Sequence, residues 1–157
     1  MMSLEGVPAF YIHSLFGTEN DYDLYKETGY NRSLNRSKID SDKINLDDDT
    51  SKESKIYKKL RELLVLRRKQ AAFHPNALQF TLHLGNKLYG IWRQSMDKKQ
   101  RIFCITNLTE KITTLSLLDI NLDDSEKWCD LISQETLEDN ISSIDLKPYQ
   151  TVWLSNM

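Results

Sequence analysis

The pattern of apolar and polar residues divides the chain into three regions, and the first is a short apolar run. This run, VPAFYI at residues 7–12, is continuous rather than alternating. Continuous runs of this length are typical of strands covered on both faces, as in parallel sheets. Such a strand needs neighbouring strands, and no second run like it follows. We therefore interpret residues 7–12 as one strand of a larger parallel structure, of which this chain holds a part.

The second region is a long polar segment, from about residue 14 to residue 50. It has almost no helical or strand period, although DYDLYKET at residues 21–28 is compatible with a short helix. Gly29 and the Asn, Ser and Arg residues that follow it favour an irregular path. Irregular connections longer than about 12 to 15 residues are uncommon and are usually functional or disordered. A functional loop is therefore our hypothesis for this segment.

A helix is predicted after the loop. Thr50 and Glu53 fit a capping box, with Thr50 as the N-cap. Apolar residues then recur at helical spacing, and they are Ile56, Leu60, Leu63 and Leu64. Basic residues at positions 67–69 suit the last turn of a helix, and Pro75 prevents any continuation.

The third region has the rhythm of short strands. The candidate strands are LQFTLHL, KLYGIWRQ, RIFCITNL, TTLSLL, KWCDLI and YQTVWLS. They are closely spaced and bounded by Gly, Asn, Asp or Lys, which is typical of an antiparallel all-β sandwich or rolled sheet. The sequence thus predicts two parts, residues 1–76 with strand, loop and helix, and residues 77–157 with the β domain.

Composition excludes several classes of partner. The 21 basic and 23 acidic residues leave a net charge of −2, so no basic excess points to nucleic acid. No stretch reaches the roughly 18 to 20 apolar residues of a membrane span, and the N-terminal residues lack the pattern of a signal peptide. Cys104 and Cys129 are too few for a disulfide framework. We expect a cytoplasmic protein with no nucleic-acid or membrane partner.

Metal binding and nucleophilic catalysis find no support in the sequence. The three histidines, His13, His74 and His83, are far apart and lack the paired spacing of a zinc site. No G-x-S-x-G or phosphate-binding glycine loop occurs, and Cys104 lies in a strand pattern as a small core residue. We expect no metal and no other cofactor. His13, at the end of the apolar run, either is hydrogen-bonded in the wall of the fold or faces a polar cleft.

Two arginines in the loop are the leading candidates for a binding site. Arg32 and Arg36 are four residues apart, and a turn of the backbone would let both guanidinium groups bind one anion or carboxylate. The alternative is a pair of solvated surface arginines. If residues 7–12 form a barrel strand, the loop leaves its C-terminal end, which is the face where (β/α)-barrels build active sites.

The aromatic residues of the third region also allow two interpretations. They are Tyr89, Trp92, Phe103, Trp128, Tyr149 and Trp153. Exposed together, they would form a platform for a sugar, but strand spacing favours a shared hydrophobic core.

Several segments together resemble one family. GVPAFYIHSL, GTEND and TGYNRSLNR are similar to the last barrel strand and its loop in sucrose phosphorylase-like enzymes of the α-amylase superfamily of glycoside hydrolases. LRELLVLRRKQAAFHPN resembles the last barrel helix, and FCITNLT, DLIS and PYQTVWLSN resemble the C-terminal β domain. The resemblance implies the last strand, loop and helix of a (β/α)-barrel, followed by an antiparallel all-β domain.

The resemblance also implies a chemistry and four site residues. The family transfers an α-glucosyl group by a retaining double displacement with phosphate as acceptor, using carboxylates from earlier barrel strands. No position in this chain matches those carboxylates, so no catalytic residue is expected in it. Arg32 occupies the place of an arginine that binds phosphate or the acceptor sugar, and Arg36 matches the closing arginine of that motif. Asn20 and Asp21 match an Asn-Asp pair, which we expect first to shape the loop and second to contact the substrate.

We therefore expect the C-terminal part of an enzyme acting on sucrose or a related α-glucoside, with a sugar and phosphate as its partners. The chain alone should be inactive, since it lacks the carboxylates. A free-standing carbohydrate-binding or interaction module is the alternative, and a catalytically dead homologue is a third possibility. Donor, acceptor, the choice between phosphorolysis and hydrolysis, and the oligomeric state stay open.

Overall fold

The computed structural model describes residues 1–122 and 125–156, and for Lys43 the backbone alone. By internal packing the chain divides into two units. The β unit joins Met1–Pro8 to Val65–Met157, and the helical unit is Ala9–Leu64. The division expected between residues 76 and 77 coincides with neither boundary, because the N-terminal segment and the end of the long helix pack with the strands.

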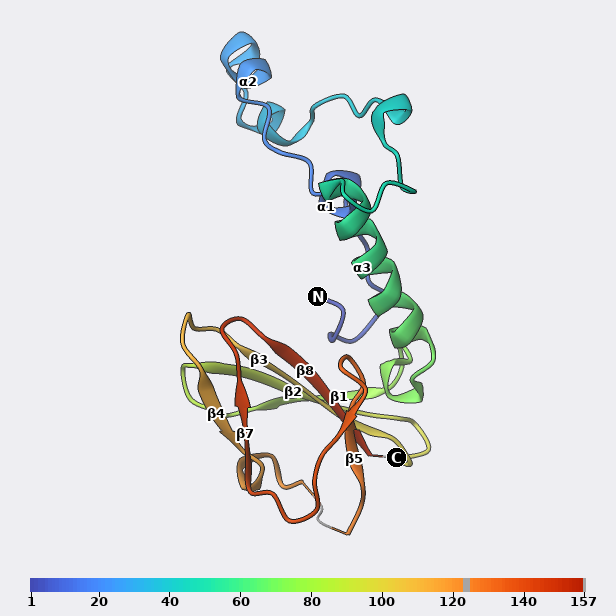
Figure 1. The fold of residues 1–157 in the computed structure, drawn as a ribbon, viewed down its shortest axis with the longest axis vertical. Coiled ribbons are helices and arrows are strands. Elements are labelled where there is room, and N and C mark those ends of the chain that lie inside the picture. The colour runs from blue at the N-terminus through green and yellow to red at the C-terminus, as the bar shows by residue number, and fades with distance from the viewer. Residues whose placement is uncertain (123–124, 157) are drawn as a thin grey trace. The chain divides into compact units, whose positions relative to one another are not determined.

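Two antiparallel sheets form the β unit (Figure 1). The large sheet has the order β1 (Leu78–Leu82), β2 (Leu88–Gln94), β3 (Arg101–Asn107), β8 (Thr151–Asn156), β5 (Trp128–Asp130) and β6 (Glu135–Thr136). The small sheet pairs β4 (Thr113–Ser116) with β7 (Ser143–Leu146). All six strands expected from the sequence form, which confirms the antiparallel β domain. The very short β6 and the Ser- and Asp-containing β7 were not expected.

The main hydrophobic core lies between the two sheets. Its buried residues come from both sheets and their connections, and they are Leu88, Phe103, Ile105, Leu115, Leu117, Ile120, Trp128, Leu146, Val152 and Leu154. Ile120 belongs to the 3-10 helix η4 (Leu118–Ile120), which follows β4. Alternation along each strand sends these side chains to one face, which explains why the period-2 pattern was visible in the sequence.

Aromatic rings form a row across this core face. Phe80, Trp92, Phe103 and Trp128 succeed one another with centroid separations of 4.8, 6.0 and 5.3 Å. Phe103 and Trp128 are buried, as is Trp153 on the opposite face, whereas Tyr89 and Tyr149 are 42% and 67% exposed. The core interpretation thus holds for the phenylalanine and the tryptophans, and fails for the two tyrosines.

The opposite face of the large sheet is covered by the ends of the unit's helical and N-terminal segments. Cys104 and Trp153 are neighbours on β3 and β8, and Phe73 of η3 (Ala71–Phe73) packs on Trp153 with ring centroids 4.7 Å apart. Burial raises the pKa of the Cys104 thiol to about 12. Cys104 is therefore a core residue, as expected.

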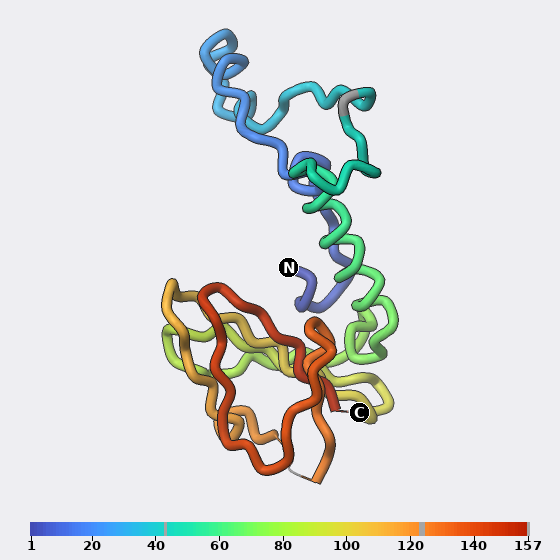
Figure 2. The backbone as a smooth tube through the Cα atoms, in the orientation of Figure 1, coloured from blue at the N-terminus to red at the C-terminus, as the bar shows by residue number. Residues whose placement is uncertain are grey.

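The helical unit holds short helices joined by irregular chain. They are α1 (Ile12–Phe16), α2 (Tyr22–Thr28), the 3-10 helices η1 (Asn31–Asn35) and η2 (Ser41–Lys43), and the first four turns of α3 (Lys52–Arg68). Figure 2 shows the irregular backbone between α2 and α3. The predicted helix is confirmed, but its cap is one residue later than expected. Ser51 Oγ accepts the N–H of Ser54 at 3.2 Å, whereas Thr50 donates its hydroxyl to Asp48.

The strand expected at residues 7–12 does not form. Val7 is 80% exposed, residues 7–11 have no strand pairing, and Ile12 already begins α1. A parallel strand is held by hydrogen bonds to neighbours on both sides, and the described residues contain no strand available to pair with it. The apolar pattern was real, but the pattern alone cannot supply the neighbours that it requires.

Candidate functional site

The four predicted site residues lie in the helical unit, around α2 and η1. Asp21 is the N-cap of α2, and its carboxylate accepts the N–H of Leu24 at 2.8 Å. The backbone N–H of Asp21 donates to the carbonyl of Leu34 in η1 at 2.7 Å. Asp21 therefore starts one helix and ties it to the next. Its neighbour Asn20 is exposed.

A tight turn joins α2 to η1. Gly29 ends α2 in the left-handed conformation, with φ of 67°, which glycine adopts without strain. The hydroxyls of Thr28 and Ser33 lie 2.7 Å apart in a hydrogen bond. Thr28 also donates to the carbonyl of Leu24 and accepts the N–H of Tyr30. Side-chain hydroxyls thus fix the backbone from which the two arginines project.

Arg32 and Arg36 project from this backbone with exposed side chains. The Arg32 guanidinium carbon lies 5.9 Å from the centroid of the Tyr30 ring, a cation–π contact. Arg36 caps η1 and donates its backbone N–H to Ser33. Within the described part of the chain, neither guanidinium forms an ion pair. Both cations are therefore free to bind an anion.

The structure does not establish that the two arginines converge. Residues four apart in a 3-10 helix point about 120° from one another around its axis. Arg36 lies just past η1, with φ of −130° and ψ of 27°, so its direction also depends on the chain that follows. A single anion held by both groups remains a prediction.

Tyr11 is a residue of this region that sequence reasoning missed. Its hydroxyl donates to the carbonyl of Asn35 at 2.9 Å, directly before Arg36. Its ring lies 5.1 Å from that of His13, which is only 9% exposed. Within the described residues, Nδ1 of His13 has no hydrogen-bond partner. Because Tyr11 lies within the apolar run, the pattern suggested a core residue and gave no signal of this anchoring role.

The glycine of the GTEND segment permits close packing within the helical unit. Gly17 has φ of 60°, and a Cβ atom there would lie 2.2 Å from Cδ1 of Ile56 on α3. Phe16 stacks beside Tyr57 of the same helix, with centroids 6.1 Å apart. A glycine is therefore required where α1 meets α3.

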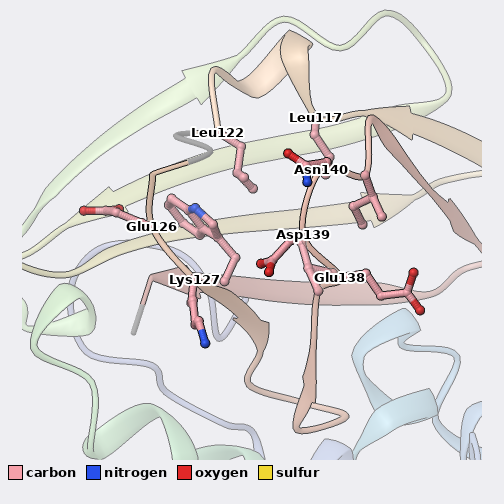
Figure 3. Close-up of a pocket in the computed structure, with 10 residues that line it drawn as sticks. Leu117, Leu122, Glu126, Lys127, Glu138, Asp139 and Asn140 are labelled. Atoms are coloured by element: carbon pink, nitrogen blue, oxygen red, sulfur yellow. The ribbon is translucent and has the colours of Figure 1, made fainter.

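A cavity in the β unit does not compete as a sugar site. It is lined by Leu117, Leu122, Trp128 and residues 137–141, among others, and encloses about 30 Å³, the volume of about one water molecule. Figure 3 shows the charged ends of Glu126, Lys127 and Glu138 pointing away from one another. The described residues contain no cluster of metal-ligating side chains, and no helix among them is long and apolar enough to cross a membrane.

Comparisons with known proteins place the chain beside phosphorylases. No family model matches it. It is 30% identical over 165 residues to a glucosylglycerate phosphorylase of Spirochaeta thermophila, covering 99% of this chain and 28% of the relative. Proteins of the same name from Escherichia coli and Allomeiothermus silvanus are 31% and 33% identical, each over 98% of this chain. The chain spans about a quarter of the length of these curated relatives.

Solved structures agree on the fold. The crystal structure of AmyP in complex with maltose matches 76% of this chain with a TM-score of 0.59 and 19% identity. The MutB E254Q mutant in complex with the substrate sucrose matches 71% with a TM-score of 0.50 and 17% identity. At this identity the likeness concerns the fold alone.

The class is thus defined by fold alone, and it is the class to which the solved AmyP and MutB structures belong. Within that class the comparisons confirm the resemblance to phosphorylases of α-glucosides, and a C-terminal portion of such an enzyme fits them. They do not test the roles of Arg32, Arg36, Asn20 and Asp21, which stay predictions.

Proposed function

We propose that this chain is the C-terminal part of a cytoplasmic, retaining α-glucosyl-transferring phosphorylase. The observation that carries the proposal is the similarity to three glucosylglycerate phosphorylases over at least 98% of the chain. The carboxylates that cleave the glycosidic bond would lie upstream, since two-carboxylate chemistry needs groups on both sides of the sugar. The isolated chain would then be inactive.

In this proposal the helical unit supplies the acceptor side of the site. Arg32 and Arg36 are exposed, without carboxylate partners in the described residues, and fixed at the backbone by hydrogen bonds. Arginine forms charge-assisted, often bidentate hydrogen bonds with phosphate. The β unit, with its own core, would stabilise the enzyme and take no part in the chemistry.

Among α-glucosides we favour glucosylglycerate over sucrose as the donor. All three relatives carry the name glucosylglycerate phosphorylase. In phosphorolysis, glycerate is the leaving group and carries a carboxylate, and phosphate is the acceptor that replaces it. The same arginines would therefore bind either the glycerate carboxylate or the phosphate. Assays of the intact enzyme with each donor, measuring phosphate-dependent release of glucose 1-phosphate, test this choice. Preference for sucrose would contradict it.

Arg32→Ala in the intact enzyme tests the acceptor role. Loss of a charge-assisted hydrogen bond costs about 1.5 to 3 kcal/mol, so the KM for phosphate should rise roughly 10- to 150-fold. Donor cleavage, measured as hydrolysis without phosphate, should change little. Arg61→Ala, which removes an exposed arginine of α3, is the matched control. An equal loss in both half-reactions would argue against the acceptor role.

The exposed tyrosines favour a second candidate, a carbohydrate-binding module. Tyr89 and Tyr149 are 42% and 67% exposed on the β unit, and exposed aromatic rings can stack on sugars. Titration of the 157-residue chain with maltotriose separates the two candidates. The phosphorylase proposal expects no saturable binding, whereas saturable binding that Tyr149→Ala abolishes would favour the module.

A further inference from the structure

A buried arginine at the end of α3 binds the N-terminal segment of the chain. Arg67 is 5% exposed. Its Nη1 donates to the carbonyl of Met2 at 2.8 Å, and its Nη2 donates to the carbonyls of Leu4 and Gly6 at 3.3 and 2.8 Å. Within the described residues no carboxylate pairs with this guanidinium. Arginines are almost never fully buried unless paired, so three convergent carbonyls in place of a carboxylate require an explanation.

The guanidinium is also fixed from the side of the sheet. Its carbon lies 4.9 Å from the centroid of the Phe73 ring, and that ring packs edge-on against Trp153 of β8. Trp153 in turn donates its indole N–H to the hydroxyl of Ser3 at 3.0 Å. Desolvation lowers the pKa of Arg67, but an arginine guanidinium keeps its proton in proteins. The charge is therefore retained and held in one place.

The position of Arg67 in the chain gives this contact its meaning. The helical unit begins at Ala9 and ends at Leu64. Gly6 lies just before its first residue, and Arg67 lies just after its last. One side chain therefore joins the chain segments that flank the two ends of the helical unit, which carries Arg32 and Arg36.

A second buried arginine serves as an internal comparison. Arg93 of β2 is fully buried and donates to the carbonyls of Ala72, His74 and Ala77. All of these acceptors lie after Leu64, within one continuous part of the β unit. Arg93 thus stabilises a local turn. Arg67, unlike Arg93, links the chain segments that flank the two ends of the helical unit.

We propose that Arg67 is a positioning residue for the acceptor site, because it holds together the two chain segments that flank the helical unit. That unit bears Arg32 and Arg36. This inference rests on the proposed phosphorylase function for its catalytic consequence. The planar guanidinium can donate to three carbonyls at once, whereas a lysine ammonium is a compact donor on a flexible stem. Displacement of a binding group by about 1 Å can cost up to about 100-fold in rate. Loss of the contacts of Arg67 with the N-terminal segment should therefore displace the acceptor arginines and weaken phosphate binding.

Arg67→Lys in the intact enzyme tests the catalytic consequence. The variant keeps the charge and loses the three-way geometry, so we expect the KM for phosphate to rise about 5- to 20-fold. Hydrolysis of the donor without phosphate should stay within about twofold, because the carboxylates lie elsewhere. Arg68→Lys, at an exposed neighbouring position, is the control. An unchanged KM in a folded Arg67→Lys variant, or an equal loss in both reactions, would overturn the positioning role.

Hydrogen exchange of the 157-residue chain tests, without an activity assay, whether Arg67 holds the two flanking segments together. In Arg67→Lys, amides of Ala9–Leu64 should exchange faster, while those of β2, β3 and β8 keep their protection. If Arg67→Lys fails to fold, Ser3→Ala, which removes the hydrogen bond from Trp153, supplies a milder loosening of the same segment. Unchanged exchange in the helical unit would overturn the inference that Arg67 holds the two flanking segments together. If the intact wild-type enzyme lacks phosphorolysis, the proposed function fails. The exchange measurement still decides whether Arg67 holds the segments that flank the helical unit.

Discussion

The β unit and the helical unit satisfy their polar groups in different ways. In the β unit, Asn107 is fully buried, and its amide donates to the carbonyls of Lys111, Leu146 and Lys147. Asp130 accepts the N–H of Trp153 far along the chain. In the helical unit, the side-chain hydrogen bonds of α2 and its following turn join residues close in sequence, and Ile12, Tyr22 and Tyr30 are exposed.

The difference indicates where each unit obtains its structure. Buried, fully satisfied side chains such as Asn107 leave few alternative arrangements, because any other arrangement strands buried polar groups. The helical unit relies on caps and turns, each of which contributes about 1 kcal/mol. We therefore expect the β unit to unfold cooperatively and the helical unit to open locally at lower cost.

Asn107→Ala should have the largest effect on this comparison. The variant leaves several buried groups without partners, each at a cost of about 1 to 3 kcal/mol, so the free energy of unfolding should fall by about 3 kcal/mol or more. Urea unfolding followed by tryptophan fluorescence is the suitable measurement, since Trp92, Trp128 and Trp153 all belong to the β unit. Asn86→Ala, at an exposed turn, is the control. A loss below about 1 kcal/mol would contradict the role of Asn107.

Alkaline pH should weaken the β unit through Cys104. Burial raises the thiol pKa to about 12, whereas an unfolded cysteine has a pKa of about 8.5. Stability is therefore complete below about pH 8.5 and falls as the pH rises toward 12, by about 2 kcal/mol at pH 10. Cys104→Ala should flatten this pH dependence in urea unfolding between pH 8 and 11, even though the new cavity lowers its overall stability. Parallel pH profiles for the two proteins would refute the prediction.

Asp21→Ala should have the smallest effect and leave the β unit untouched. Loss of the N-cap of α2 costs about 1 kcal/mol, so amides of Tyr22–Thr28 should exchange faster with solvent. The urea midpoint by tryptophan fluorescence should stay the same, because no tryptophan lies in the helical unit. Asp23→Ala removes an exposed ion pair with Lys26 and should change exchange less. A shifted fluorescence midpoint in Asp21→Ala would show that the two units unfold together.

The sequence predicted what local periodicity determines. The six expected strands formed because alternating apolar residues reach one core, and the stripe of α3 identified the helix. The prediction was wrong at residues 7–12, because strand formation requires neighbouring strands, which an apolar pattern alone does not supply. It also missed Arg67, because the basic run at residues 67–69 was fully explained by the helix dipole. Burial and carbonyl partners depend on tertiary contacts, which spacing alone does not reveal.

The candidate site was predictable only as far as the resemblance reached. Arg32, Arg36 and Asn20 lie exposed in one loop region, but residue spacing does not determine the directions of their side chains. The role of Asp21 in capping α2 follows from the common preference of Asp for N-caps, whereas the sequence predicted Asp21 as a loop-shaping and substrate-binding residue. Tyr11 gave no signal, since a hydroxyl bonded to a distant carbonyl has no sequence pattern.

The bond between Ser3 and Trp153 has a consequence for how the protein is made. The two residues are 150 positions apart, so the segment Met1–Pro8 is held by a strand that is synthesised much later. Ser3 cannot form this bond until β8 has emerged from the ribosome. Such long separations slow folding, because the loop must close before the contact is rewarded. The β unit should therefore complete its fold only after β8 has been synthesised, and not when the helical unit emerges.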